Sequence, residues 1–316
     1  MANLEPSASE RAAIVELVDG RLASAPGFDE RSLDELLARV DAEAPQQARE
    51  LRSIAQATGL APARLLLLDG GLLAALTGAE VERSLGLYVD GPGGSVLAGA
   101  WSLPPEEAAH VELRPRAGGG LVFGLPGSFG LAGIAAAGHA VLANVLRPRA
   151  LGPGIPGSML LQRLLDAPRL EQARAAIEAT ALVDGRNWML ADGRVFFGIE
   201  QLGAERILTR VGPKTGHVHA NHCFDPSLRQ REATPRSPAS FRRLELASTI
   251  YVQRRPISAA EVLAFFDEVE QAAFAEPAGR AQTLLAIELE GGVAHWRRCA
   301  SERVQTTRFH TPLAHD

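Results

Sequence analysis

A group of potential metal ligands lies in the stretch HVHANHC, which contains His217, His219, His222 and Cys223. If this stretch forms a strand, residues two apart share one face, so His217 and His219 could point at one ion while His222 reaches it from the following turn. Imidazole and thiolate groups are common zinc ligands. No acidic or cysteine partner stands at a zinc spacing elsewhere, so we expect ordinary strand-end histidines and neither a metal nor another cofactor.

A serine in a glycine-containing turn is a second candidate for chemistry. The stretch LPGSFG around Ser128 is similar to the G-x-S-x-G turn that presents a nucleophilic serine. Pro126 replaces its first glycine, and the flanking pattern is not a strand followed by a helix. A simple turn is therefore expected. The sequence also contains the carboxylates Glu106, Glu107, Asp184, Asp192 and Glu200. Their spacing does not indicate that any two of them form a general acid and base pair.

Composition excludes several classes of function. The chain has 316 residues, a formal net charge of -5 and scattered arginines, so it lacks the basic patch of a nucleic-acid-binding protein. No signal-peptide pattern opens the chain, and no apolar run approaches the ~18 residues of a membrane span. The two cysteines, Cys223 and Cys299, show no CxxC spacing. We expect a cytoplasmic protein that binds neither nucleic acid nor membrane.

Hydrophobic patterning divides the chain into a helical N-terminal region, 1–77, and a core domain, 78–316. Apolar residues recur every three or four positions in the first region, which is the helical period. Short alternating runs separated by Gly and Pro follow, and they predict consecutive hairpins. Later stretches predict further helices and strands in blocks: helices over 158–167 and 169–182, strands within 187–223, helices over 237–250 and 258–274, and a hairpin over 282–299. This order favours an α+β layered sandwich over a doubly wound sheet.

Two serines have the spacing of a helix-capping box. Ser32 stands three residues before Glu35, and Ser258 stands three residues before Glu261. In such a box the serine side chain binds a free backbone amide of the first helical turn. We therefore expect one helix to begin just after Ser32 and another just after Ser258.

Taken in order, several stretches resemble the isopenicillin-N acyltransferase-like family of N-terminal-nucleophile hydrolases. They cover roughly residues 45–300 and include LAGAWSLPPEEAAHVELRP, GLAGIAAAGHAVLANVLRP, GRNWMLAD, GHVHANHCF and SFRRLE. The resemblance implies a four-layer αββα sandwich. It also implies chemistry in which self-cleavage after a helical pro-segment exposes an N-terminal cysteine, whose own α-amine serves as the base.

The resemblance further implies that much of this chemistry has been lost. A gapless alignment places Arg83 at the position of the cysteine, and a guanidinium, which stays protonated, cannot act as a nucleophile. Trp101 survives from the segment that surrounds the thiol in the family. Other positions that are polar or charged in the family are replaced: Gly99, Ala100, Ser102 and Ala135.

Some positions of the family's site are retained. Asn221 matches the residue that donates to the oxyanion, and Arg243, or alternatively Arg242, matches a basic residue. Asn144 and Asn187 match polar positions near the cleft. We expect each of these asparagines either to serve the site or simply to satisfy a turn.

Two functions follow from the resemblance. The first is a divergent acyltransferase- or amidohydrolase-like protein with a silent or repurposed cleft that binds a small amide or acyl ligand, either as a homo-oligomer or beside an active paralogue. Its binding residues would be Arg83, Trp101, Asn144, Asn187 and Arg243. The alternative is an active amide hydrolase or acyltransferase with Ser84 as nucleophile and Asn221 as oxyanion donor. Its weakness is that a one-residue slip along a strand turns a side chain to the opposite face.

Overall fold

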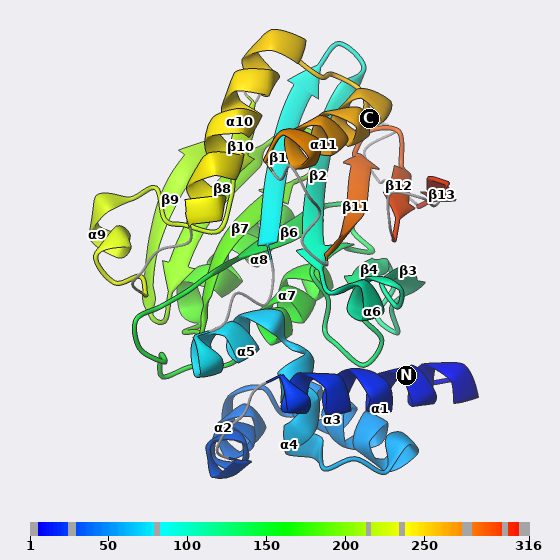
Figure 1. The fold of residues 1–316 in the computed structure, drawn as a ribbon, viewed down its shortest axis with the longest axis vertical. Coiled ribbons are helices and arrows are strands. Elements are labelled where there is room, and N and C mark those ends of the chain that lie inside the picture. The colour runs from blue at the N-terminus through cyan, green and yellow to red at the C-terminus, as the bar shows by residue number, and fades with distance from the viewer. Residues whose placement is uncertain are drawn as a thin grey trace.

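Two antiparallel β-sheets pack face to face at the centre of the molecule (Figure 1). The computed structural model describes residues 6–24, 30–78, 83–212, 216–233, 238–273, 280–298 and 303–309. In spatial order the first sheet consists of β10 (His217–His219), β1 (Arg83–Gly91), β2 (Gly94–Leu103), β11 (Ala281–Glu288), β12 (Val293–Arg297) and β13 (Gln305–Arg308). The second consists of β3 (Glu112–Pro115), β4 (Leu121–Gly124), β5 (Ala132–Ile134), β6 (Ala140–Leu146), β7 (Gly185–Ala191), β8 (Phe196–Leu202) and β9 (Glu205–Val211).

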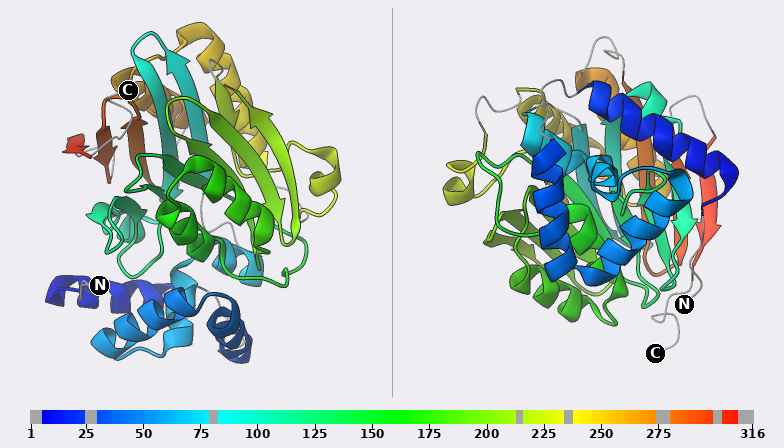
Figure 2. Two further views of the ribbon diagram at one scale, coloured as in Figure 1. Left: turned by 180° about the vertical axis from the view of Figure 1, so that it is seen from behind. Right: turned by 90° about the horizontal axis from the view of Figure 1, so that it is seen from below.

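Helices cover the outer faces of both sheets. On the first sheet lie α10 (Pro238–Arg254) and α11 (Ala259–Ala273), and on the second lie α7 (Gly157–Asp166) and α8 (Leu170–Ala179) (Figures 1 and 2). The short helices α6 (Pro105–Ala108) and α9 (Pro226–Arg229) lie in connections. The expected αββα sandwich is thereby confirmed.

The N-terminal region is helical and lies at one end of the sandwich (Figure 2). It contains α1 (Ala8–Ala23), α2 (Glu30–Glu43), α3 (Pro45–Thr58), α4 (Pro62–Leu65), the 3-10 turn η1 (Leu66–Leu68) and α5 (Gly70–Thr77). The predicted capping box of Ser258 and Glu261 is confirmed, because each residue binds the backbone N–H of the other. The box at Ser32 is wrong: α2 already begins at Glu30, so Ser32 lies within the first turn of the helix.

Strand alternation gives β1 two different faces. Leu85, Leu87 and Val89 pack in a cluster with residues of α10 and α11. Tyr88 points the other way and stacks on Phe196 of the second sheet, with ring centroids 4.4 Å apart. Side chains at even-numbered positions of β1 therefore lie between the sheets.

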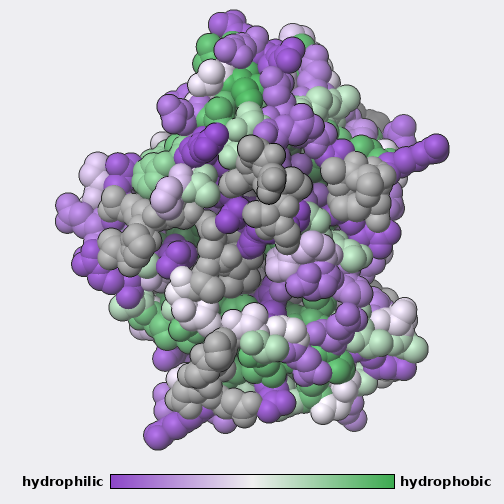
Figure 3. All heavy atoms as spheres, viewed as in Figure 1, coloured by the Kyte–Doolittle hydropathy of each residue, from purple (hydrophilic) through white to green (hydrophobic). Residues whose placement is uncertain are grey.

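The face that carries α10 and α11 is largely hydrophilic, with hydrophobic residues in scattered areas (Figure 3). Val252 and Ile257 are examples of exposed apolar side chains in this part of the chain. Isolated exposed apolar residues are normal on a protein surface. No helix in the described ranges is long and apolar enough to cross a membrane.

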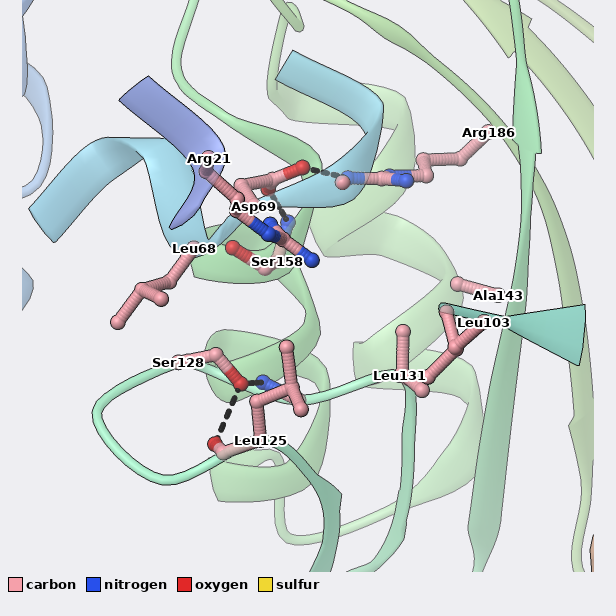
Figure 4. A pocket seen from close by; sticks show the side chains of 12 residues that line it. Arg21, Leu68, Asp69, Leu103, Leu125, Ser128, Leu131, Ala143, Ser158 and Arg186 are labelled. Atoms are coloured by element: carbon pink, nitrogen blue, oxygen red, sulfur yellow. Dashed lines mark hydrogen bonds and ion pairs between the residues drawn. The ribbon is translucent and has the colours of Figure 1, made fainter. Parts of the chain in front are cut away.

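Buried ion pairs join the N-terminal helices to the core. Arg21 of α1 forms a bidentate pair with Glu107 of α6, with N–O distances of 2.7 and 2.8 Å. Asp69, the N-cap of α5, pairs with Arg186 of β7 and accepts a hydrogen bond of 2.9 Å from the backbone N–H of Ser158 (Figure 4). These pairs fix the helical region against the sandwich.

Two carboxylates share the Arg186 guanidinium. Asp184 lies 2.8 Å from it, and the three side chains are buried. Burial raises the pKa of Asp184 to about 7, and the charge of Asp69 opposes the lowering effect of Arg186. Burial would also raise the pKa of Asp69, but Arg186 and hydrogen bonds from Ser158 and Leu72 lower it to about 2. Asp69 is thus the principal counter-ion of Arg186.

We predict that Asp184 makes the protein less stable as the pH rises. Its pKa is about 7 in the folded protein and about 4 in an unfolded chain. The folded state therefore binds more protons between these values, and the free energy of unfolding contributed by this group falls as pH rises from 4 to 7. Asp184→Asn should remove this dependence, by up to about 1.4 kcal/mol per pH unit, in urea unfolding from pH 5 to 8. Asp192→Asn in a hairpin turn is the control, and equal slopes in all three proteins would contradict the assignment.

Candidate functional site

The carboxamide of Asn221 binds Ser84 at two atoms. The backbone N–H of Ser84 donates to Oδ1 of Asn221 at 2.7 Å, and Nδ2 of Asn221 donates to Oγ of Ser84, also at 2.7 Å. Ser84 is the second residue of β1 and is only 1% exposed. Its even-numbered position places its side chain between the sheets, on the same face as Tyr88. A hydroxyl and a carboxamide are therefore held together at the start of the central hairpin.

Other layers of the fold hold this carboxamide in place. Arg243 of α10 donates to Oδ1 of Asn221 at 2.7 Å, and Nδ2 donates to the Val145 carbonyl of β6 at 3.0 Å. The backbone N–H of Asn221 is bound by Oγ of Ser240 at 2.9 Å. Both Oδ1 and Nδ2 have partners that fix the orientation of the amide.

Asn144 and Asn187 form a buried pair directly across from each other on β6 and β7. Nδ2 of Asn187 donates to Oδ1 of Asn144 at 3.2 Å. A Cβ atom built on Gly86 would lie 2.9 Å from the same Oδ1, so Asn144 faces β1 two residues beyond Ser84. The structure thus brings Ser84, Asn221 and Asn144 to one region between the sheets.

Arg83 lies apart from this group. As the neighbour of Ser84 on an extended strand, it occupies the opposite face, which it shares with Leu85. The gapless alignment had placed Arg83 at the nucleophile position, but the side chain that contacts Asn221 belongs to Ser84. Neighbours on a strand occupy opposite faces, and here it is Arg83, rather than Ser84, whose side chain faces away from the Asn221 carboxamide.

The positions interpreted as lost catalytic residues divide between the two faces of β2. Ala100 packs with the α10–α11 cluster, and Oγ of Ser102 donates to Glu270 of α11 at 2.9 Å. Both lie on the face away from Ser84. Gly99 faces the second sheet, where a Cβ atom would lie 2.4 Å from the Trp101 ring and 2.5 Å from Leu142. A charged side chain at position 100 or 102 would therefore point away from Ser84, and one at position 99 would collide with Trp101 and Leu142.

Trp101 is paired with Ser84 across the β1–β2 ladder and is fully buried. Its ring packs against Phe123 of the second sheet, with centroids 5.4 Å apart. Apolar contacts of this kind fill the space between the sheets. The Trp101 side chain lies in the hydrophobic core, and its binding role stays a prediction.

A small cavity lies where the N-terminal helices meet the sandwich (Figure 4). Its volume is about 20 Å³, which is room for about one water molecule. Figure 4 shows Arg21, Asp69, Ser158 and Arg186 around it on the polar side. Ser84 and Asn221 do not line it, so this cavity is not a substrate site of Ser84.

The basic residues of α10 have different environments. Arg243 is 2% exposed and contacts Asn221. Arg242 lines an open hollow on the protein surface with Phe241 and Glu245. Arg243 is therefore the residue that belongs to the candidate site.

The histidine rings of β10 and the following loop pack against aromatic rings. Among the described residues no group of three potential ligands is placed to hold a metal. His219 binds Glu200 at 2.7 Å, and His222 binds Ser240 at 2.8 Å. Burial lowers the pKa of His217 to about 3 and that of His222 to about 4, and nearby cationic groups add to the effect. Both rings are therefore neutral at neutral pH.

The remaining sequence candidates have structural roles. Ser128 donates to the carbonyl of Leu125 at 2.7 Å and accepts from Gly130 N–H, which confirms the expected turn. Cys223 is a buried free thiol whose pKa is raised, mainly by burial. Such a thiol is a poor nucleophile. Cys299 lies outside the described residues.

Two residues of the site were not found from the sequence. Ser240 and Glu200 bind the loop that carries Asn221, and Glu200 appeared among carboxylates without a recognisable spacing. Their partners are 18 to 25 residues away in the sequence. Spacing gives no signal for such contacts, although an isolated Glu within the apolar run FFGIEQL does suggest a buried, partnered carboxylate.

Comparisons with known proteins assign no family. No family model matches the chain, and no curated protein matches it significantly. Among solved structures, a mutant conjugated bile acid hydrolase from Clostridium perfringens is 12% identical, with a TM-score of 0.48 over 71% of this chain and 92% of that one. Penicillin V acylase from Agrobacterium tumefaciens is also 12% identical, with a TM-score of 0.40 over 71% of this chain and 86% of that one. At these values neither likeness indicates a function for this chain.

We predict that Gly99→Ala destabilises the fold by about 1–3 kcal/mol, because an added methyl group overpacks the space against Trp101 and Leu142. Urea unfolding measures the effect. Gly20→Ala is the matched control, since a Cβ atom at Gly20 in α1 meets nothing within 4 Å. That control should be neutral or stabilising by up to about 1 kcal/mol. Equal stability of the Gly99 variant and the unmodified protein would show that the space beside Trp101 is not closely packed.

Proposed function

We propose that this protein acts on amide bonds through Ser84, first on its own Arg83–Ser84 peptide bond and then on an acyl amide. One observation carries the proposal: the Asn221 carboxamide binds both the backbone nitrogen and the hydroxyl of Ser84, at 2.7 Å each. The nitrogen is the leaving group of self-cleavage, and the hydroxyl is the nucleophile. Both reacting atoms of Ser84 are thus held by one side chain.

Self-cleavage would proceed by an N-to-O acyl shift. Oγ of Ser84 attacks the carbonyl carbon of Arg83, the C–N bond breaks, and the hydroxyl proton ends on the departing nitrogen. The product is an ester between Arg83 and Oγ of Ser84. One water molecule hydrolyses this ester, which leaves a carboxylate on Arg83 and a free α-amine and hydroxyl on Ser84.

The free α-amine would then serve as the base for an external substrate. It takes the proton of Oγ as the oxygen attacks the substrate carbonyl, and it returns the proton to the departing amine. Water then hydrolyses the acyl-Ser84 ester, or a second amine accepts the acyl group. Nδ2 of Asn221 would exchange its bond to Oγ for one to the developing oxyanion, a role worth about 3–4 kcal/mol in other acyl-transfer enzymes.

Arg243 supports this chemistry electrostatically. Its guanidinium donates to Oδ1 of Asn221 at 2.7 Å, which polarises the amide and strengthens Nδ2 as a donor. A nearby positive charge also lowers the pKa of an α-amine, whose ordinary value is about 8. The charge of Arg243 would therefore favour the neutral amine, which is the form that can accept a proton.

A second candidate is a silent protein with no amide chemistry. It is favoured by the packing around Ser84, which is 1% exposed and faces the buried Trp101 across the ladder. A substrate could reach Ser84 only if neighbouring groups moved. In this candidate the Ser84–Asn221 bonds serve stability alone, and any amide or acyl ligand binds elsewhere.

Intact mass of purified protein, with and without hydroxylamine, tests the first proposal. Hydroxylamine cleaves esters, so it should convert an Arg83–Ser84 ester into two fragments, 1–83 and 84–316. We expect these fragments from the unmodified protein and an uncleaved chain from Ser84→Ala. Ser102→Ala is the matched control, since Ser102 lies on the opposite face of the hairpin and should leave cleavage unchanged.

Asn221→Ala should slow the cleavage by about 10²–10³-fold if Nδ2 stabilises the oxyanion. Cleaved protein is then assayed with a panel of acyl amides. An unmodified chain that stays in one piece after long incubation with hydroxylamine would overturn the Ser84 proposal and leave the silent protein. Cleavage that persists in Ser84→Ala would assign the nucleophile elsewhere.

A further inference from the structure

Glu200 of β8 is a fully buried carboxylate with several donors around it. Its Oε1 binds Nε2 of His219 at 2.7 Å and also accepts from the backbone N–H of Phe224. Its Oε2 accepts from the N–H of Asp225 at 3.0 Å. A buried carboxylate is tolerated only with such compensation. Glu200 thus binds both ends of the segment 219–225, and Asn221 lies inside this segment.

His219 is bound by acceptors at both ring nitrogens. Its Nδ1 lies 2.7 Å from the carbonyl oxygen of Ala220, and its Nε2 lies 2.7 Å from Glu200. A carbonyl can only accept, so Nδ1 donates to Ala220; with Glu200 ionised Nε2 donates as well, and the ring is then an imidazolium. In that state Glu200 and His219 form a buried pair of opposite charges.

The rest of the segment is fixed by contacts of the same kind. The Phe224 ring stacks on His219, with centroids 4.2 Å apart. The N–H of Asn221 donates to Ser240, and the N–H of Cys223 donates to Glu232 at 2.7 Å. Side-chain oxygens of Ser240, Glu232 and Glu200 thus bind the backbone amides of residues 221, 223, 224 and 225, which leaves the backbone of Asn221 little freedom.

We propose that Glu200 is a positioning residue for Asn221: through His219 and the amides of Phe224 and Asp225, it holds the loop so that the carboxamide meets Ser84. Its effect on catalysis rests on the proposed function, whereas its effect on geometry does not. Glu200→Gln keeps the shape but turns one acceptor into an N–H₂ donor that faces other donors. The loop then loses bonds at one end, and Asn221 shifts away from Ser84.

The geometry is tested in a Ser84→Ala background, where the chain stays whole and residue 84 keeps its backbone N–H. Hydrogen exchange by NMR reports the bond from this N–H to Oδ1 of Asn221. Adding Glu200→Gln should lower protection at residue 84 at least about tenfold. Glu290→Gln is the matched control, because Glu290 accepts from Ser95 N–H at 2.7 Å near the far end of the β1–β2 hairpin. It should expose Ser95 and leave residue 84 protected.

Nitrogen-15 NMR of the His219 ring is a second measurement that needs no Glu200 variant. Both ring nitrogens should carry protons at neutral pH in the Ser84→Ala protein, and a neutral ring would overturn the charge pair. Unchanged protection of residue 84 in a folded Glu200→Gln protein would overturn the positioning role.

The effect of Glu200 on catalysis is tested in the chain with Ser84 intact. Glu200→Gln should slow hydroxylamine-dependent cleavage at least about tenfold, while Glu290→Gln should not. If the unmodified chain never cleaves, the proposed function fails, yet the exchange and ring measurements still decide the role of Glu200. Cleavage at an unchanged rate in Glu200→Gln would remove its catalytic importance.

Discussion

The Asn221 carboxamide is the interaction on which the candidate site depends, because it joins three layers of the sandwich. It binds Ser84 in the first sheet, the Val145 carbonyl in the second sheet and Arg243 in the outer helix α10. A carboxamide has one acceptor oxygen and two N–H groups. Here Oδ1 accepts from both Ser84 and Arg243, and Nδ2 donates to both Ser84 and Val145. Displacement of any of these layers would change the position of Asn221 relative to the Ser84 hydroxyl.

This constraint explains why so much of the surrounding structure is polar and buried. Ser240 and Glu200 bind the loop of Asn221, and the buried amides Asn144 and Asn187 face β1 from the second sheet. Buried polar groups are costly unless they are bound, and networks of them favour one arrangement over its alternatives. The apolar core beside them, with Trp101 against Phe123, adds close packing between the same two sheets.

The N-terminal helices are joined to the core by charge as well as by apolar packing. Asp69 brings a carboxylate from the helical region to Arg186, and Arg21 brings a guanidinium to Glu107. Removing one partner of a buried pair leaves an uncompensated charge, which is strongly destabilising. If the Arg83–Ser84 bond is cleaved, these pairs would keep the released helical region bound to the sandwich.

The sequence by itself determined the layers of the fold. Helical and alternating periods, with Gly and Pro turns between them, predicted the helical N-terminal region, the hairpins and an α+β layered sandwich, since these features depend on local patterns of burial. The αββα order of the layers was implied by the family resemblance. Asn221, Arg243, Asn144 and Asn187 were named from the resemblance, and Ser84 was kept as an alternative. The predicted start of α2 was wrong by three residues, because a serine and a glutamate at the right spacing do not form a cap when the helix already includes both.

Only the tertiary structure decided which face each of these side chains occupies. A gapless alignment could not distinguish Arg83 from Ser84, because neighbours on a strand differ by one residue in sequence but by a whole face in space. By the same alternation, Ala100 and Ser102 of β2 face the layer of α10 and α11. Glu200 and the Asp69–Arg186–Asp184 group were not predicted, because their partners come together only when distant elements pack, and no spacing in one sequence records that contact.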